Sequence, residues 1–287
     1  MNAFWVDLKK NILSPNFIIS VLLMALLCLL ADAPTVSARE PLSILDEIVK
    51  MRKEIWLEKG SEFSSISILY HFDNSIWFNI ILPIIAAFTV VYHFSDEWFG
   101  DNYILTLYRS GYKKYTFAKF SSAFVTGFLV ALTGIFLFGL VVFGIFPSLR
   151  EFGDGTNWYF DSAYQTGGSA LIAKILNHSF VCGEYAFLSL FVCLILKDKF
   201  FTLSIFMVVN YFCVKLDVKF MNTVSLTDSK NRALRGLFPN NQTELYTILP
   251  SELHISFYWC IGFVFLLFTI ITLISFFLIR RRYKYAS

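Results

Sequence analysis

Six long apolar stretches constrain this chain more than any other feature of its sequence. A helix that crosses a bilayer needs about 20 mostly apolar residues. Runs of this kind lie at 17–31, 76–94, 120–146, 180–196, 200–214 and 255–279. The first, fourth and fifth are short, but the first can extend back through Ile12 and the fourth through 171–176, where Lys174 interrupts the apolar pattern. We therefore expect an all-α integral membrane protein, with six transmembrane helices in a single domain over 1–287.

The composition indicates that lipid surrounds most of this chain. Of 287 residues, 56% are hydrophobic and only 16% are charged, whereas about a quarter of a soluble domain is charged. A net charge of +3 without a basic cluster on a polar segment does not indicate nucleic acid as a partner. The five cysteines lie in or beside apolar runs without short spacings, which favours buried hydrophobic roles over metal ligands or disulfides.

The first apolar run also has a second interpretation. Lys9 and Lys10 precede it and the triplet Ala31-Asp32-Ala33 follows it, a pattern that fits a cleaved signal peptide. Because the sequence retains this segment from Met1 onward, we favour a membrane span.

The positions of the basic residues predict the orientation. Cytoplasmic loops carry an excess of Lys and Arg close to the membrane ends. With the N-terminus inside, half of the 24 basic residues fall on short inner segments: Lys9, Lys10, Arg109, Lys113, Lys114, Lys119, Lys197, Lys199, Arg280, Arg281, Arg282 and Lys284. We therefore expect both termini in the cytoplasm.

The outer segment after the first run contains a stretch, 41–60, that predicts an amphipathic helix. Pro41 suits a first helical position and Gly60 the residue just past the end. Such a helix can lie on the membrane or on neighbouring loops, or cap an extracellular vestibule. The apolar side follows a 3.6-residue period through Leu45, Ile48, Val49, Arg52, Ile55 and Trp56, and the polar side carries Asp46, Glu47, Lys50, Lys53, Glu54 and Glu58.

The inner loop at 95–119 is the most informative segment for function. Ser95 suits an N-cap, and Asp96 and Glu97 complement the positive start of a helix. An apolar stripe follows, then a basic turn at 109–111. The stripe consists of Trp98, Phe99, Tyr103, Ile104, Leu107 and Tyr108. From the residues alone, this helix fits equally well an interfacial helix or a docking surface for a cytoplasmic protein.

The same loop resembles that of permease subunits of type-two ATP-binding cassette exporters. The resemblance consists of Glu97, then Gly100, a leucine-rich helix, a small-residue turn near Gly111, and Lys119 at the start of the next span. It extends to six spans with both ends inside and to a basic C-terminal tail. A short amphipathic N-terminal segment also matches, with Phe4, Trp5 and Leu8 opposite Asp7, Lys9 and Lys10.

The resemblance implies that the loop is a coupling helix, which docks on a separate cytoplasmic nucleotide-binding ATPase. That ATPase would bind ATP and Mg, and this chain would bind no cofactor. A second permease copy or a paralogue would complete the transporter in a bacterial cell membrane, and the substrate would be amphipathic or lipid-like, such as an antimicrobial peptide. The coupling residues would be Glu97, Trp98, Phe99, Gly100, Ile104, Leu107 and Arg109.

Polar and small residues inside the spans give further candidates. Glu184 and Asn210 are candidates for the translocation path, because ionisable and polar groups are costly in hydrocarbon. Glu184 also fits a satisfied structural carboxylate, and Asn210 fits a hydrogen bond between helices. Ala123, Gly127 and Ala131 repeat every four residues, which predicts a face where helices pack closely.

No enzyme signature is found. The sequence has no H-E-x-x-H, no G-x-S-x-G and no G-x-x-x-x-G-K-[ST] motif, and the four histidines share no ligand spacing. We therefore expect a transport subunit that is not itself an enzyme. The alternatives are a secondary transporter or channel, and a non-transporting immunity or assembly factor in the membrane.

Overall fold

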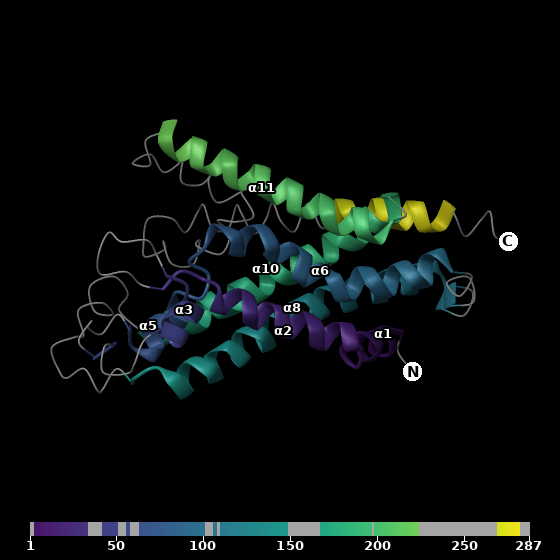
Figure 1. The fold of residues 1–287 in the computed structure, drawn as a ribbon. Coiled ribbons are helices and arrows are strands. Elements are labelled where there is room, and N and C mark those ends of the chain that lie inside the picture. Colours follow the sequence, from purple (N-terminus) through teal and green to yellow (C-terminus); the bar gives the residue numbers. More distant parts are fainter. Residues whose placement is uncertain are drawn as a thin grey trace.

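The computed structural model describes residues 3–33, 42–50, 56–57, 63–100, 106–107, 110–148, 167–196, 198–223 and 269–281. Within these ranges the regular elements are helices, and the one β-type contact is an isolated bridge between Asp32 and Ser43. Figure 1 shows the long helices side by side. They are α1 (Ala3–Ile12), α2 (Pro15–Leu29), α3 (Ile44–Lys50), α5 (Ser65–Tyr70), α6 (Ile76–Phe99), α8 (Tyr112–Ile145), α10 (Gly167–Leu196) and α11 (Lys199–Thr223), with a further helix at 269–281.

Four of the described helices are long and apolar enough to cross a membrane. These helices are Trp77–Phe99, Tyr112–Ile145, Lys174–Leu196 and Lys199–Leu216, and they contain the second to fifth predicted runs. A fifth span is present if α1 and α2 are counted together as one bent span. Of the sixth predicted run, 255–279, only the part from 269 onward lies within the described residues. The fold is thus all-helical with four or five candidate spans.

The first apolar run does not extend back through Ile12 as a straight helix. The Oγ of Ser14 accepts a hydrogen bond from the backbone N–H of Phe17, and Pro15 occupies the first turn of α2. Both features start a new helix, because a hydroxyl cap and a proline suit the first positions of a helix and not its interior. As a result, α1 and α2 meet at an angle of 59°.

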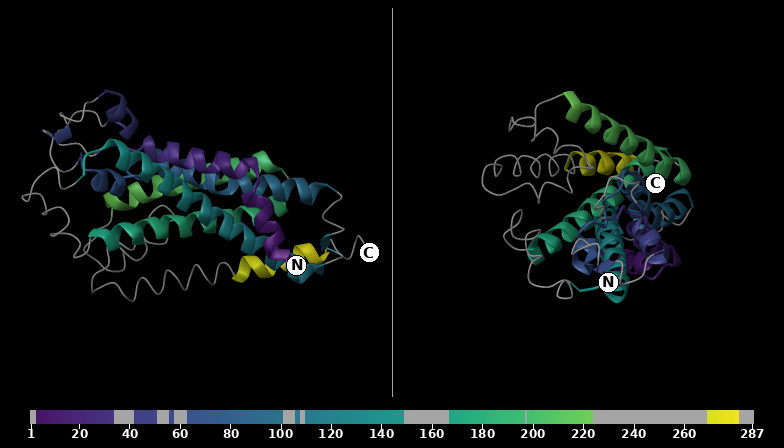
Figure 2. Two further views of the ribbon diagram at one scale, coloured as in Figure 1. Left: turned by 90° about the horizontal axis from the view of Figure 1, so that it is seen from below. Right: turned by 60° about the vertical axis from the view of Figure 1, so that its left-hand side comes forward.

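Helix α8 lies between α2 and α10, and both contacts depend on glycine. A Cβ atom added at Gly127 would lie 2.6 Å from the Cβ of Ala186 on α10. One added at Gly134 would lie 2.5 Å from the Cβ of Met24 on α2. Figure 2 shows the helices packed along their lengths. Ala123 and Ala131, the other two predicted packing residues, are fully buried.

The outer amphipathic helix differs from the expectation. Helix α3 begins at Ile44 and not at Pro41, because the Oγ of Ser43 accepts a hydrogen bond from the backbone N–H of Asp46 and so caps this turn. The predicted faces hold only in part. Ile48 and Trp56 pack in or against the core as expected, but Glu47 is buried and Val49 is 75% exposed. The bridge between Asp32 and Ser43, which precedes the helix, holds the helix in this orientation. The periodicity of the sequence cannot predict a contact of this kind.

The end of the predicted outer helix packs against the bundle. The ring of Trp56 is buried and its centroid lies 4.5 Å from that of Phe146, which follows α8. Arg52, Ile55 and Gly60 lie outside the described residues. The described part of this segment therefore covers one end of the bundle.

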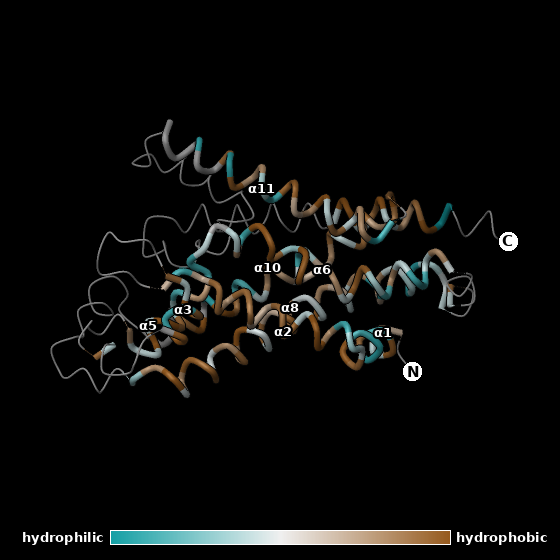
Figure 3. Tube along the Cα trace, in the orientation of Figure 1, coloured by the Kyte–Doolittle hydropathy of each residue, from teal (hydrophilic) through white to brown (hydrophobic). Residues whose placement is uncertain are grey.

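Large apolar side chains remain exposed along several helices. Figure 3 shows apolar residues along most of the length of α2, α8 and α11. An apolar surface of this extent is suited to lipid and not to water. The exposed residues include Ile18, Leu22 and Leu26 on α2, Phe136, Leu140 and Phe143 on α8, and Val208, Val209 and Phe212 on α11.

Candidate functional site

Two glycines, Gly100 and Gly111, bound the α6–α8 connection, residues 100–111. Helix α6 continues through Ser95 to Phe99, so the prediction that Ser95 caps a separate loop helix is wrong. The helix ends at Gly100, where a Cβ atom would lie only 2.9 Å from the carbonyl oxygen of Asp96. Helix α8 begins after Gly111, whose φ of 73° is favourable only for glycine.

The predicted apolar stripe is not exposed as a whole. Trp98 and Leu107 are 2% and 1% exposed and pack in the same apolar cluster as Tyr115. Both side chains thus face the interior of the bundle and not its surface. Phe99 is 39% exposed, which leaves it available to a partner. Ile104 and Arg109 lie outside the described residues.

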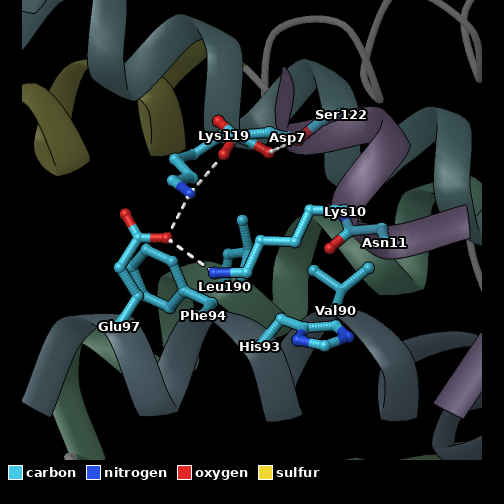
Figure 4. Close-up of a pocket in the computed structure, with 10 residues that line it drawn as sticks. All are labelled: Asp7, Lys10, Asn11, Val90, His93, Phe94, Glu97, Lys119, Ser122 and Leu190. Carbon is cyan, nitrogen blue, oxygen red and sulfur yellow. Dashed lines mark hydrogen bonds and ion pairs between the residues drawn. The ribbon is translucent and has the colours of Figure 1, made fainter. Parts of the chain in front are cut away.

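A buried ion network joins three helices at this end, as Figure 4 shows. The Nζ of Lys119 lies 2.6 Å from Oδ1 of Asp7 and 2.7 Å from Oε2 of Glu97. The Nζ of Lys10 lies 3.5 Å from the same Glu97 oxygen, and the hydroxyl of Tyr115 donates to the other one, at 3.1 Å. Because Asp7 is on α1, Glu97 on α6 and Lys119 on α8, the network fixes these helices to one another.

A small cavity adjoins the network. Its volume is about 20 Å³, room for a single water molecule. The ring of His93 lines it, and the Nε2 of this ring is buried without a hydrogen-bond partner among the described residues. Asn11 also lines the cavity and donates to the hydroxyl of Thr126 on α8, at 3.2 Å. The cavity is too small for an organic substrate.

A second charged cluster lies at the opposite end of the bundle and explains the lysine that interrupts the fourth apolar run. The Nζ of Lys174 lies 2.6 Å from Oδ1 of Asp73 and donates to the carbonyl oxygen of Tyr70, at 2.7 Å. The Nε2 of His178 lies 3.0 Å from Oδ2 of Asp73, although it is not aligned as a regular hydrogen bond requires. The turn before α6 is thereby attached to α10.

Asp73 is strongly affected by these neighbours. Burial alone would raise the pKa of Asp73, but the close approach of the His178 ring, together with the charge and the hydrogen bond of Lys174, outweighs it. They hold the pKa of this carboxyl group well below its ordinary value, so Asp73 is ionised.

The two candidates for the translocation path lie on neighbouring helices. Asn210 on α11 accepts a hydrogen bond from the hydroxyl of Tyr185 on α10, at 2.9 Å, and its amide donates to the carbonyl oxygen of Asn79 on α6. This residue joins three helices. Glu184 on α10 is 8% exposed and makes no polar contact with another described residue.

Sequence reasoning selected Glu97 and Lys119 but missed their partners. Asp7 lies 112 residues before Lys119, and no periodic pattern connects the two. The described residues contain no group of three or more His, Cys, Asp and Glu side chains that can hold a metal ion.

Comparison with known proteins adds no family to this geometry. No protein-family model, curated protein or solved structure matches the chain. The fold itself defines the class: an all-helical chain with several helices suited to a membrane.

Proposed function

We propose that this chain is the membrane-spanning permease subunit of an ATP-binding cassette exporter of the second type. A separate cytoplasmic nucleotide-binding subunit binds ATP and Mg and hydrolyses the ATP. A second copy of this chain, or a paralogue, completes the path for an amphipathic or lipid-like substrate across a bacterial cell membrane. The observation that best supports the proposal is the network around Lys119. It joins α1, α6 and α8 at the end of the bundle where α6 ends and α8 begins.

The ion network is suited to transmitting force between the helices that it joins. Buried pairs of charges with short contacts resist separation, because parting them leaves an uncompensated charge in an apolar place. A push on the 100–111 connection then moves α6 and α8 together with α1, as a rigid body. Burial of Trp98 and Leu107 adds to this stiffness, and the exposed ring of Phe99 provides an apolar contact for the ATPase.

Replacing Phe99 with Asp tests the proposal. We expect the complex purified from native cells in mild detergent to contain an ATPase subunit with a phosphate-binding loop, and Phe99→Asp to release it by at least tenfold. Leu13→Asp is the matched control, since Leu13 is also an exposed apolar residue, at 81%, in the bend between α1 and α2. If Phe99→Asp retains the ATPase as fully as the control does, the coupling role is refuted.

A proton-coupled or cation-coupled secondary transporter is the second candidate. Such proteins need buried ionisable groups within the bundle, and Glu184 is one without a polar partner among the described residues. This hypothesis predicts that the purified chain alone, in liposomes, moves substrate when an ion gradient is applied and no ATPase is present. The permease reading predicts no transport under these conditions.

A further inference from the structure

Glu184 differs from the other buried carboxyl groups described above. Glu97 and Asp73 are each paired with a lysine at less than 3 Å. Glu184 is also buried, yet it has no hydrogen bond or ion pair with any residue of the described ranges. It lies inside the candidate span Lys174–Leu196. A carboxylate in such a place is costly without a countercharge, so it marks a functional position or a partner that arrives from elsewhere.

Two phenylalanines lie next to Glu184 along α10. In an α-helix, residues three and four positions apart share one face, with Cβ atoms about 5–6 Å apart. Phe180 and Phe187 therefore flank Glu184 on the same face of α10. Their rings pack edge-to-face on two phenylalanines of α8. The ring centroids are 5.2 Å apart for Phe180 and Phe124, and 4.8 Å apart for Phe187 and Phe120.

Two further observations define the access to this face. A Cβ atom added at Gly183 would lie 2.9 Å from the ring of Phe124, so the glycine lets that ring lie against the backbone of α10 next to Glu184. Phe180 is 40% exposed. The aromatic face around the carboxyl group thus reaches the surface of the bundle one helical turn away from it.

A carboxylate beside phenylalanine rings recognises a particular chemistry. Ring faces attract organic cations, and the carboxylate supplies the full countercharge. A small hydrated metal ion needs several oxygen ligands, and the flanking phenylalanines provide none. We propose that Glu184, Phe180 and Phe187 bind the cationic group of an amphipathic substrate, such as an organic ammonium. This inference rests on the proposed transport function and adds the chemical class of the substrate.

The test measures binding of tetraphenylphosphonium, a lipophilic cation, to the purified full chain in detergent by equilibrium dialysis. We expect saturable binding by the wild-type chain, at least tenfold weaker binding by Glu184→Gln, and binding within threefold of wild type by Glu184→Asp, which keeps the charge. Triphenylphosphine oxide, a neutral analogue, should not compete. Phe136→Ala is the matched aromatic control, because Phe136 is 67% exposed on α8.

Phe180→Ala is a second test, because truncating this half-exposed side chain leaves only a small cavity inside the protein. We expect it to weaken binding at least threefold while the chain still elutes as a single species. Equal binding by wild type and Glu184→Gln, or by wild type and Phe180→Ala, would overturn the inference, as would no binding by wild type. The binding assay contains no ATPase, so its result does not depend on whether Phe99 contacts one. The two proposals can therefore be refuted independently of each other.

Discussion

Lys119 lies between two carboxylates that come from different helices. With an exposed fraction of 9% for Lys119 and for Glu97, neither charge is solvated by bulk water. Each therefore depends on the other, and Asp7 depends on Lys119 as well. The stability of this end of the bundle therefore depends strongly on a single group, the ammonium of Lys119.

Replacing Lys119 with Met should therefore be strongly destabilising. It leaves Asp7 and Glu97 close together without their shared cation, and breaking a buried pair from one side costs about 3–5 kcal/mol. The measurement is thermal unfolding of the purified chain in detergent. Lys113→Met, on an exposed position of the same helix, should have little effect. Adding Glu97→Gln and Asp7→Asn to Lys119→Met should recover part of the loss; no recovery would contradict this explanation.

Asp73 gives a prediction on pH. Its pKa is lowered in the folded chain from an ordinary value near 3.8, so its contribution to stability is fully present above that value. The contribution is lost as the pH falls below 3.8 toward the folded pKa. Asp73→Asn should thus lower the unfolding free energy by roughly 2 kcal/mol at pH 7, and the difference from wild type should shrink below pH 4.

The control for this measurement is Asp32→Asn. Burial raises the pKa of Asp32, and no cation among the described residues opposes it. Its substitution should not reproduce the loss at pH 7. A difference between wild type and Asp73→Asn that grows on acidification would contradict the assigned ion pair with Lys174.

At the scale of helices, the closest approach of the α8 backbone to α10 depends on the missing side chain of Gly127. Gly127→Val should force the helices apart, because even its Cβ would meet Ala186 and the carbonyl oxygen of Cys182 at 2.6 Å. Overpacking of this kind costs about 1–3 kcal/mol, measured as a lower thermal midpoint. Gly144→Val is the control, since nothing lies within 4 Å of a Cβ at that position. Equal midpoints for the two variants would refute the close approach.

The sequence was a good guide to where helices lie and a poor guide to which face each one buries. Length and hydropathy place α6, α8, α10 and α11 correctly, because membrane helices must be long and apolar. Ser95 misled the prediction, because serine is common at N-caps but is also tolerated inside a helix when its side chain is buried among partners. Trp98 and Leu107 form a regular stripe, but periodicity does not reveal whether a stripe faces this chain or another one.

At the scale of the whole molecule, the described start of α1 and the helix at 269–281 lie at the same end of the bundle as the 100–111 connection (Figure 1). The charge distribution predicts that this end is cytoplasmic. In a variant without its native cysteines, Lys113→Cys should react with an impermeant thiol reagent only after the cells are permeabilised. Asn74→Cys, at the other end, should react in intact cells. The reverse pattern would invert the assigned orientation.

The close contact at Gly127 also divides α8 into two arms of similar length. Tyr112 lies 15 residues before Gly127 and Ile145 lies 18 residues after it, which corresponds to about 22 Å and about 27 Å of helix. If α8 pivots as a stiff rod on this contact, it is a lever with its fulcrum near the middle. A displacement of about 1 Å at the Tyr112 end then appears as about 1.2 Å in the opposite direction at the Ile145 end. A movement of one end of α8 toward its neighbours would thus be matched by a comparable movement of the other end away from them, with no bend inside the helix.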